Sequence, residues 1–211
     1  LCNISEINHV NPGSNVTTIQ IKYGYECVVR DCNIDDNGSY SVLCFDTCLA
    51  CHVDNVCIQQ KFANAEMLYS YLIALLNSSY CTVENSYLYN KDWHCVSTGD
   101  KYLCYKNFIN NTKMYSELQF GYLDHENTLG TVVTNCSASG ICVSGLGTIK
   151  DCIITSNVGT YKACLIRLNA MSDKALASYT IKNVRLLPPA NANGTYVGIW
   201  IAASPQTTGT S

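Results

Sequence analysis

Fourteen cysteines constrain this chain more than any other feature. They are spread over most of its 211 residues rather than gathered into two tight tetrads, and their number is even. This usage is typical of proteins that fold in an oxidising compartment and is rare in reduced cytosol. The sequence therefore predicts a disulfide framework, although the pairing cannot be read from it. The cysteines expected to form disulfides are Cys2, Cys27, Cys32, Cys44, Cys48, Cys51, Cys57, Cys81, Cys95, Cys104, Cys136, Cys142, Cys152 and Cys164.

Acceptor motifs for N-glycosylation indicate the same compartment. The pattern Asn-x-Ser/Thr recurs along the chain, and x is never proline. Such motifs are modified in proteins that pass through the secretory pathway, and their glycans would replace the Lys and Glu that keep a cytosolic surface soluble. We therefore predict an extracellular glycoprotein. The expected glycosylation sites are Asn3, Asn15, Asn37, Asn77, Asn110, Asn135 and Asn193.

Composition excludes two classes of partner. Charged residues make up 14% of the chain and the net charge is −3, so no basic field is available for nucleic acid or for an anionic lipid surface. The longest apolar stretch, at 71–76, is far shorter than the roughly 20 residues that a bilayer span needs. We expect no nucleic-acid binding and no membrane insertion by this segment.

Alternating polarity predicts strands. Apolar and aromatic residues occupy every second position from 19 to 27, with polar residues or glycine between them. Clusters of Gly, Asn, Asp and Ser separate this segment from similar ones, as turns require. The other strand candidates are 40–45, 101–108, 117–123, 130–134, 140–144, 152–155, 162–167, 178–187 and 195–202.

One segment has helical periodicity instead. Apolar residues recur three and four positions apart from Ile58 to Leu76, with polar residues on the opposite side. This pattern predicts an amphipathic helix over about 56–76, capped by Asp54 or Asn55. Cysteines bracket the segment, so disulfides are expected to fix it to the neighbouring strands.

These elements predict an α+β fold. It is mainly antiparallel β with one major amphipathic helix at about 56–76, and it is disulfide-rich. No internal repeat, charge run or Pro-rich linker divides the chain. We therefore expect a single disulfide-braced, glycosylated domain over 1–203, followed by a flexible tail at 204–211.

An immunoglobulin-like sandwich is an alternative fold. Residues 36–44 are similar to the D-x-G-x-Y-x-C end of an immunoglobulin domain, where the tyrosine lies two residues before the cysteine. Here Tyr40 lies four residues before Cys44. The upstream Cys27 and Cys32 are also too close in sequence to be the partner across two sheets, so this alternative is the weaker one.

A C-x-x-C-H string at Cys48, Cys51 and His52 allows four chemistries: haem attachment, a zinc knuckle, a redox pair or structural disulfides. The flanking glycosylation motifs argue against haem, and a knuckle that also used Cys44 or Cys57 would need reduced thiols. A redox pair normally begins a helix after a strand, and this one does not. We therefore expect structural disulfides here, no bound metal and no cofactor.

Known catalytic motifs are absent from the sequence. The four histidines are His9, His52, His94 and His125, but there is no G-x-S-x-G elbow, no H-E-x-x-H and no phosphate loop. Isolated Asp and Glu residues cannot be paired from sequence. We therefore predict no catalytic residues, and the chain is not expected to be an enzyme.

An aromatic stretch at 86–95 is the candidate binding surface. Tyrosine and tryptophan are enriched at binding hot spots because each joins a large apolar area to a hydrogen-bonding end. The stretch also lies between glycosylation motifs, so glycans would not cover it. The alternative is that these rings are ordinary core and rim residues of strands. The predicted binding residues are Tyr87, Tyr89, Trp93 and Tyr102.

In composition the whole chain resembles the ectodomain of an enveloped-virus attachment glycoprotein. The shared traits are many cysteines, many glycosylation motifs, few charges, abundant Asn and Tyr, and more Lys than Arg. The resemblance implies a receptor-binding role at the virion surface, with a host cell-surface protein or glycan as partner and a fusion subunit or homo-oligomer as assembly. Two alternatives share these traits: a secreted immune-modulating decoy that binds a host protein, and a cellular receptor or adhesion module.

Overall fold

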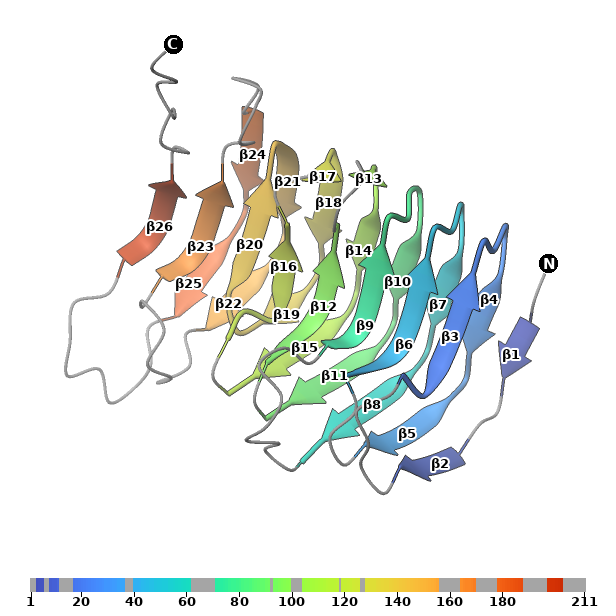
Figure 1. Cartoon of the computed structure of the whole chain (residues 1–211). Helices are drawn as coiled ribbons and strands as arrows, with labels where there is room; N and C mark the ends of the chain where they lie inside the picture. Colours follow the sequence, from blue (N-terminus) through green and yellow to red (C-terminus); the bar gives the residue numbers. More distant parts are fainter. Residues whose placement is uncertain are drawn as a thin grey trace, which may run out of the picture.

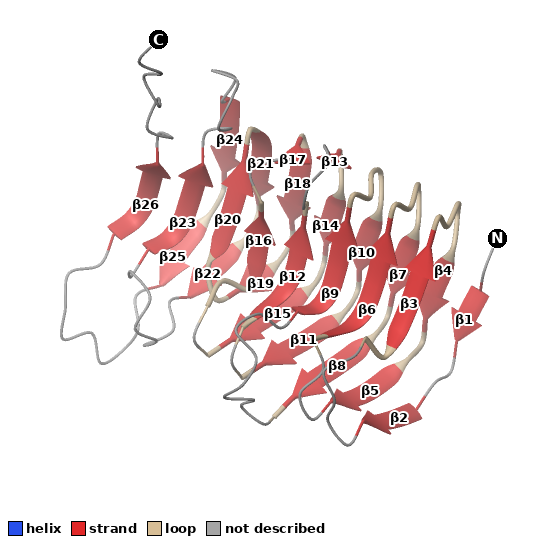
Figure 2. Cartoon of the chain, in the orientation of Figure 1, coloured by secondary structure: helices blue, strands red, loops and turns tan. Residues whose placement is uncertain are grey.

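The backbone winds as a parallel β-helix, in which each coil adds one strand to each of three sheets (Figure 1). The computed structural model describes residues 3–5, 8–11, 17–36, 40–61, 71–91, 93–99, 104–117, 119–125, 128–155, 164–169, 178–187 and 197–202. Strands and the turns between them make up this part of the chain, and none of it is helical (Figure 2). Within it, no helix has the length and apolarity that a bilayer span requires.

The three sheets each contain eight of the described strands, and all neighbouring strands are parallel. Sheet 1 contains β1 (Asn3–Ser5), β4 (Val28–Arg30), β7 (His52–Asp54), β10 (Thr82–Glu84), β14 (Phe108–Asn110), β18 (Thr131–Thr134), β21 (Leu146–Lys150) and β24 (Ser178–Lys182). Sheet 2 contains β2 (Asn8–Asn11), β5 (Asn33–Asp36), β8 (Cys57–Gln60), β11 (Tyr87–Asn90), β15 (Lys113–Ser116), β19 (Ser137–Ala138), β22 (Ile153–Thr155) and β25 (Arg185–Leu187). Sheet 3 contains β3 (Ile19–Lys22), β6 (Ser41–Asp46), β9 (Tyr71–Leu76), β12 (His94–Thr98), β16 (Tyr122–Asp124), β20 (Ile141–Ser144), β23 (Cys164–Asn169) and β26 (Val197–Ala202). A short fourth sheet pairs β13 (Cys104–Tyr105) with β17 (Thr128–Leu129).

Similar residues stack in columns inside the coils. In sheet 2 the pairing register places Ile34, Ile58, Leu88 and Met114 side by side, and all four are fully buried. Strands about 4.8 Å apart let such side chains pack against one another along the whole axis. The corresponding column of sheet 1 contains Val29, Val53, Val83, Ile109 and Val133.

The corner between sheets 1 and 2 is a two-residue turn with a fixed conformation. In the described turns the first residue has a left-handed backbone, with φ between 45° and 54°. Only Asn or Asp occupies this position, because their short polar side chains tolerate a conformation that other L-residues avoid. We call this column the amide ladder. Its members are Asp31, Asn55, Asn85, Asn111, Asn135, Asp151 and Asn183.

Sheet 3 is buried on both faces over much of its length. In β6 the residues from Ser41 to Phe45 are buried, and in β9 the side chains from Leu72 to Leu75 are fully inaccessible. A strand with two covered faces has a continuous apolar sequence instead of an alternating one. This explains why Tyr71–Leu76 reads as an unbroken apolar run.

The predicted α+β fold is wrong, because the described part of the chain contains no helix at 56–76. Residues 57–60 form β8 and residues 71–76 form β9, while 62–70 lie outside the described residues. Part of the apparent spacing of three and four therefore comes from Ile58 of β8 and the apolar residues of β9. The expected antiparallel pairing is also wrong, since successive coils run in the same direction.

Several individual strands are confirmed. The segments predicted at 40–45, 130–134, 140–144 and 152–155 coincide within one residue with β6, β18, β20 and β22. The division into one domain at 1–203 and a tail stays a prediction.

The disulfide-rich architecture is also wrong, because none of the thirteen described cysteines is joined in a disulfide. Twelve of them are buried, several at stacked interior positions, and Cys57 is half-buried. Cys27, Cys51 and Cys81 hold the same place before successive strands of sheet 1, and in the next coil Asn107 takes that place. Burial raises the pKa of the Cys81 thiol to about 12, as expected of a small apolar packing residue. Cys2 lies outside the described residues.

Turn chemistry offers another explanation for several glycosylation motifs. Asn135 is the first residue of a corner between sheets 1 and 2, and its amide donates at 3.0 Å to Oδ1 of Asn110, the last residue of β14. Where a corner Asn is followed two residues later by Ser or Thr, the sequence matches the glycosylation motif, and the backbone conformation of the turn alone explains why Asn is there. Glycosylation stays a prediction for the whole set, and Asn15, Asn37 and Asn193 lie outside the described residues.

Candidate functional site

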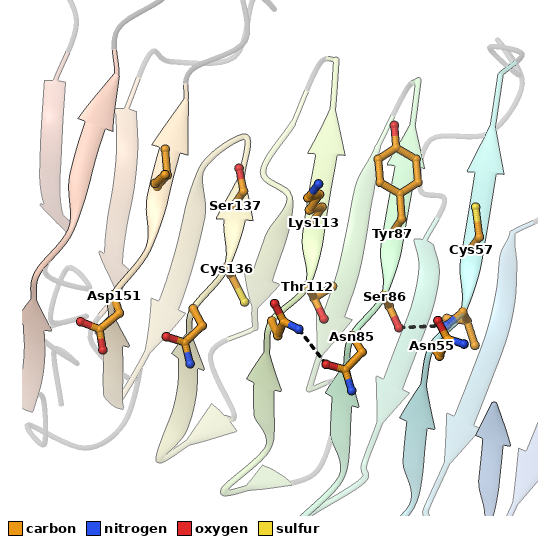
Figure 3. A pocket seen from close by; sticks show the side chains of 14 residues that line it. Asn55, Cys57, Asn85, Ser86, Tyr87, Thr112, Lys113, Cys136, Ser137 and Asp151 are labelled. Atoms are coloured by element: carbon orange, nitrogen blue, oxygen red, sulfur yellow. Dashed lines mark hydrogen bonds between the residues drawn. The ribbon is translucent and has the colours of Figure 1, made fainter. Parts of the chain in front are cut away.

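A groove follows the corner between sheets 1 and 2 (Figure 3). Its volume is about 490 Å³. One side consists of amide-ladder residues from Asn55 to Asp151, and the other consists of the first residues of the sheet 2 strands. The groove therefore runs along the β-helix axis and presents similar groups from one coil to the next. The first strand residues that line it are Cys57, Tyr87, Lys113, Ser137 and Ile153.

Hydrogen bonds between coils hold the ladder side chains. Asn111 Nδ2 donates to Asn85 Oδ1 at 2.8 Å, and Asn85 Nδ2 donates to Asp54 Oδ1 at 2.7 Å. Asn135 Nδ2 donates to Asn110 Oδ1 at 3.0 Å. A carboxamide has two N–H donors and an oxygen with two lone pairs, so these bonds leave donors and acceptors available to a ligand.

Two of the residues that follow ladder positions, Ser86 and Thr112, are small, polar and buried. Ser86 Oγ donates to the Glu84 carbonyl at 2.6 Å and accepts from the Val56 amide at 3.2 Å. Thr112 Oγ1 donates to the Asn110 carbonyl at 2.8 Å. These bonds satisfy the turn backbone and fix the groove wall, so the site is preorganised.

Tyrosines form the outer surface of sheet 2 beside the groove. Tyr87 is 38% exposed, and its ring centroid lies 6.3 Å from that of Tyr115. Tyr115 in turn shares a 2.9 Å hydrogen bond with Ser137. Because both rings are held by neighbours, they present two apolar faces with polar ends next to the amide ladder, inclined at 56° to each other.

Asp151 is the acidic residue among those that line the groove, and its charge is compensated. Asn183 Nδ2 donates to its carboxylate at 3.0 Å, and Lys150 Nζ lies 3.3 Å away. The Asn183 hydrogen bond, aided by Lys150, lowers the pKa of Asp151. The carboxylate is thus engaged by its own neighbours.

The structure brings together two of the four predicted binding residues. Tyr87 and Tyr89 both point outward from β11, and Tyr89 donates its hydroxyl to Glu117. Trp93 lies elsewhere: it packs with the buried cluster of sheet 3, and its ring meets His94 at a centroid distance of 5.4 Å. Tyr102 lies outside the described residues.

Ionisable groups lie across the ladder, on the outer face of sheet 1. Glu84 Oε1 accepts from Asn110 Nδ2 at 3.2 Å, and His52 Nε2 is 3.8 Å from Glu84 Oε2. His52 also hydrogen-bonds with Thr82. The pairing register places Asp54 beside Glu84, so carboxylates and an imidazole lie close to the groove without lining it.

A carboxyl group is buried inside the coils at the last residue of β16, in the middle of sheet 3. Asp124 is 1% exposed and accepts hydrogen bonds from Thr98, Tyr122 and Thr131. The Ser144 amide donates to its second oxygen at 3.3 Å. Burial raises the pKa of Asp124 to about 6, and the hydroxyl donors partly offset that effect. The group is remote from solvent, so we assign it to stability.

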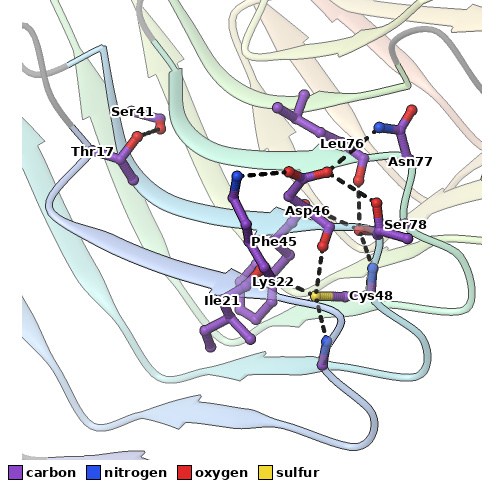
Figure 4. A network of polar contacts seen from close by, with 12 residues as sticks. Thr17, Ile21, Lys22, Ser41, Phe45, Asp46, Cys48, Leu76, Asn77 and Ser78 are labelled. Atoms are coloured by element: carbon purple, nitrogen blue, oxygen red, sulfur yellow. Dashed lines mark hydrogen bonds and ion pairs between the residues drawn. The ribbon is translucent and has the colours of Figure 1, made fainter.

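The C-x-x-C-H string at 48–52 is structural. Cys48 Sγ donates to the Ile21 carbonyl at 3.2 Å and accepts from the Gly24 amide at 3.3 Å, while the Cys48 amide donates to Ser78 Oγ at 3.0 Å (Figure 4). The thiol thus packs against the backbone of a neighbouring coil. No set of three or more His, Cys, Asp or Glu side chains in the described residues is arranged to hold a metal ion.

Sequence reasoning missed the ladder, although a signal for it exists. An apolar residue, any residue, then Asn or Asp recurs before each sheet 2 strand from β5 to β25, as in Val29 to Asp31 and Val53 to Asn55. The coils differ in length, with ladder partners 24, 26 or 32 residues apart. A search for one fixed period would not detect this repeat.

No family model matches the chain, and no curated protein matches its sequence. Among solved structures, the tailspike protein gp49 from Pseudomonas phage LKA1 is similar over 88% of this chain, with a TM-score of 0.75 and 15% identity. The chain spans 31% of that tailspike's length. The alginate lyase from Paenibacillus sp. str. FPU-7 aligns over 87% of this chain and 79% of its own, with 15% identity and a TM-score of 0.47. At these identities the likeness to the tailspike establishes the fold alone.

These comparisons correct two expectations. The similar viral structure is a phage tailspike, so the resemblance to viral surface proteins holds only in part and does not extend to enveloped-virus glycoproteins. The prediction that the chain is not an enzyme is also wrong, because the missing motifs do not exclude an enzyme. It rested only on missing motifs that belong to other folds, and the parallel β-helix of this chain is not one of those folds.

Proposed function

We propose that the chain is a surface-attachment domain that binds an extended polysaccharide along the groove. The observation that carries the proposal is the continuous line of ladder amides from Asn55 to Asp151, with the exposed ring of Tyr87 beside it. A polymer with a repeating backbone fits a groove whose lining repeats with each coil. The partner class is therefore a host-surface glycan rather than a protein receptor.

The chemistry of the lining supports this ligand class. Sugar hydroxyls both donate and accept hydrogen bonds, and carboxamides do the same. The apolar C–H faces of sugar rings pack on aromatic side chains, which Tyr87 and Tyr115 provide. A groove whose lining extends over several coils also suits a long chain better than a small molecule, which would be enclosed on most sides.

The fold shared with a phage tailspike is consistent with a role at a virus surface, and we include that location in the proposal. We also propose assembly as a homo-oligomer, as the virion-surface role implies. The chain spans only 31% of the tailspike's length. An activity of the whole tailspike therefore applies to this chain only as a proposal. The same binding assay also measures whether the bound polymer is cleaved.

Tyr87→Ala is expected to weaken polysaccharide binding about tenfold or more, since hot-spot aromatic residues contribute roughly 1 to 3 kcal/mol. The ligand is first identified on an array of bacterial and host polysaccharides, and affinity is then measured by isothermal titration calorimetry. New chain ends are assayed in the same samples to detect cleavage.

Tyr23→Ala is the matched control. Tyr23 is 80% exposed and lies at the corner that follows β3, away from the groove, so its loss should leave affinity unchanged. Equal affinities for the wild type and the Tyr87→Ala variant would contradict the assignment of the site. An array with no bound polysaccharide would contradict the proposed function itself.

A further inference from the structure

Lys113 occupies a central position in the groove. It is the first residue of β15, and the register of sheet 2 places it between Tyr87 of β11 and Ser137 of β19. Its side chain is exposed and lines the groove beside the ladder residue Asn111. A polymer that follows the ladder and packs on Tyr87 would pass this ammonium group.

The positive charge of Lys113 has no carboxylate within ion-pair distance among the described residues, in contrast to several other lysines. Strand β15 also has no acidic residue of its own. The described lysine ion pairs are Lys22 with Asp46, Lys61 with Asp35, and Lys150 with Asp151.

The acidic residues around the groove are all engaged by their own neighbours. Asp54 accepts from Asn85, and Glu84 accepts from Asn110 across the ladder. These bonds reduce the field that the carboxylates project into the groove. Glu117, which directly follows β15, accepts from Tyr89. At the C-terminal end of the groove, Asp151 is held by Asn183 and Lys150.

We propose that Lys113 forms an anion subsite, so that the ligand is an acidic polysaccharide whose sugars carry carboxylates. In this subsite the ammonium faces the sugar carboxylate, the Asn111 amide supplies a further donor, and the Tyr87 ring packs against the adjacent sugar. This inference rests on the proposed function and specifies its substrate class.

The test uses pairs of polymers that differ only in charge. Polygalacturonate, alginate and hyaluronan are each compared with a carboxyl-reduced, neutral form of the same polymer, by titration against the full chain. The acidic member of at least one pair should bind more tightly than its neutral form. Its affinity should also fall as salt is raised to about 0.5 M, because an exposed ion pair is screened.

Lys113→Gln should lower affinity for the acidic polymer about fivefold, the upper range for an exposed ion pair, and leave affinity for a neutral polymer unchanged. Lys106→Gln is the control, because Lys106 is exposed at the opposite end of β14. The thermal midpoints of both variants should equal that of the wild type, which separates binding from folding.

The outcomes distinguish the two proposals. Binding of neutral polymers in preference to acidic ones, with no effect of Lys113→Gln, would overturn the anion subsite and leave the proposed function standing. If no polysaccharide binds at all, both fail.

Discussion

Relative to an Asp124→Asn variant, the wild-type chain is expected to lose about 3 kcal/mol of unfolding free energy as the pH rises from about 3 to about 8. The cause is the burial of this carboxyl group among hydroxyl side chains inside the coils. Asparagine has nearly the same shape but does not ionise, so it removes the pH-dependent part of the cost.

The sign follows from the two pKa values of Asp124. In the unfolded chain the carboxyl ionises near 3.8, whereas in the folded chain burial raises its pKa to about 6. Between these values the folded state holds a proton that the unfolded state has released. Protonation therefore stabilises the fold below about pH 4, and this contribution is lost as the pH rises through about 6.

Other groups titrate in the same range but cancel in the comparison. Burial lowers the pKa of His94 to about 3, which destabilises the fold as the solution becomes acidic. This effect is present in both proteins. Urea unfolding followed by circular dichroism at closely spaced pH values measures the difference, and parallel stability curves for wild type and Asp124→Asn would contradict the account.

Asn85→Val is expected to lower the unfolding free energy by about 3 kcal/mol. Asn85 has φ of 52°, where a β-branched residue is strained by about 1 to 3 kcal/mol. The substitution also removes the bonds to Asp54 and from Asn111, each worth roughly 0.5 to 1.5 kcal/mol. Chemical denaturation of the two proteins gives the value.

Asn85→Gly separates the two causes. Glycine adopts the left-handed conformation without strain but makes no side-chain bonds, so its cost should be about 1 to 2 kcal/mol. Equal losses for the valine and glycine variants would show that backbone conformation does not explain why Asn and Asp occupy this column.

The fold could be predicted from the sequence only at the level of single strands. The segments 40–45 and 130–134 either alternate between polar and apolar residues or are apolar over a short length. This pattern predicts both strands correctly. The segment 56–76 was misread, since an apolar run buried on both faces has no period of two. Short local windows cannot distinguish such a strand from part of a buried helix.

The repeat was hidden for a second physical reason. The corner between sheets 1 and 2 keeps its length of two residues, but the other parts of a coil differ in length, so ladder partners lie 24 residues apart in one coil and 32 in another. The stacked columns also account for the misread cysteines. Cys27, Cys51 and Cys81 recur because they fill one interior position, and recurrence resembles a disulfide framework.

Part of the candidate site could be predicted from residue type alone. Tyr87 and Tyr89 stood out as aromatic residues with polar ends, and they do lie on an outward surface. Trp93 has the same chemical character but packs into the cluster of sheet 3. The amide ladder could not be recognised, because its members come together only when successive coils stack.

A crystal structure of the chain with its best-bound oligosaccharide tests the central claim most directly. The account predicts density for the sugar chain along the ladder between Asn55 and Asp151, with one ring against Tyr87 and an acidic group near Lys113. Density on another surface, such as the outer face of sheet 1, with an empty groove, would contradict it.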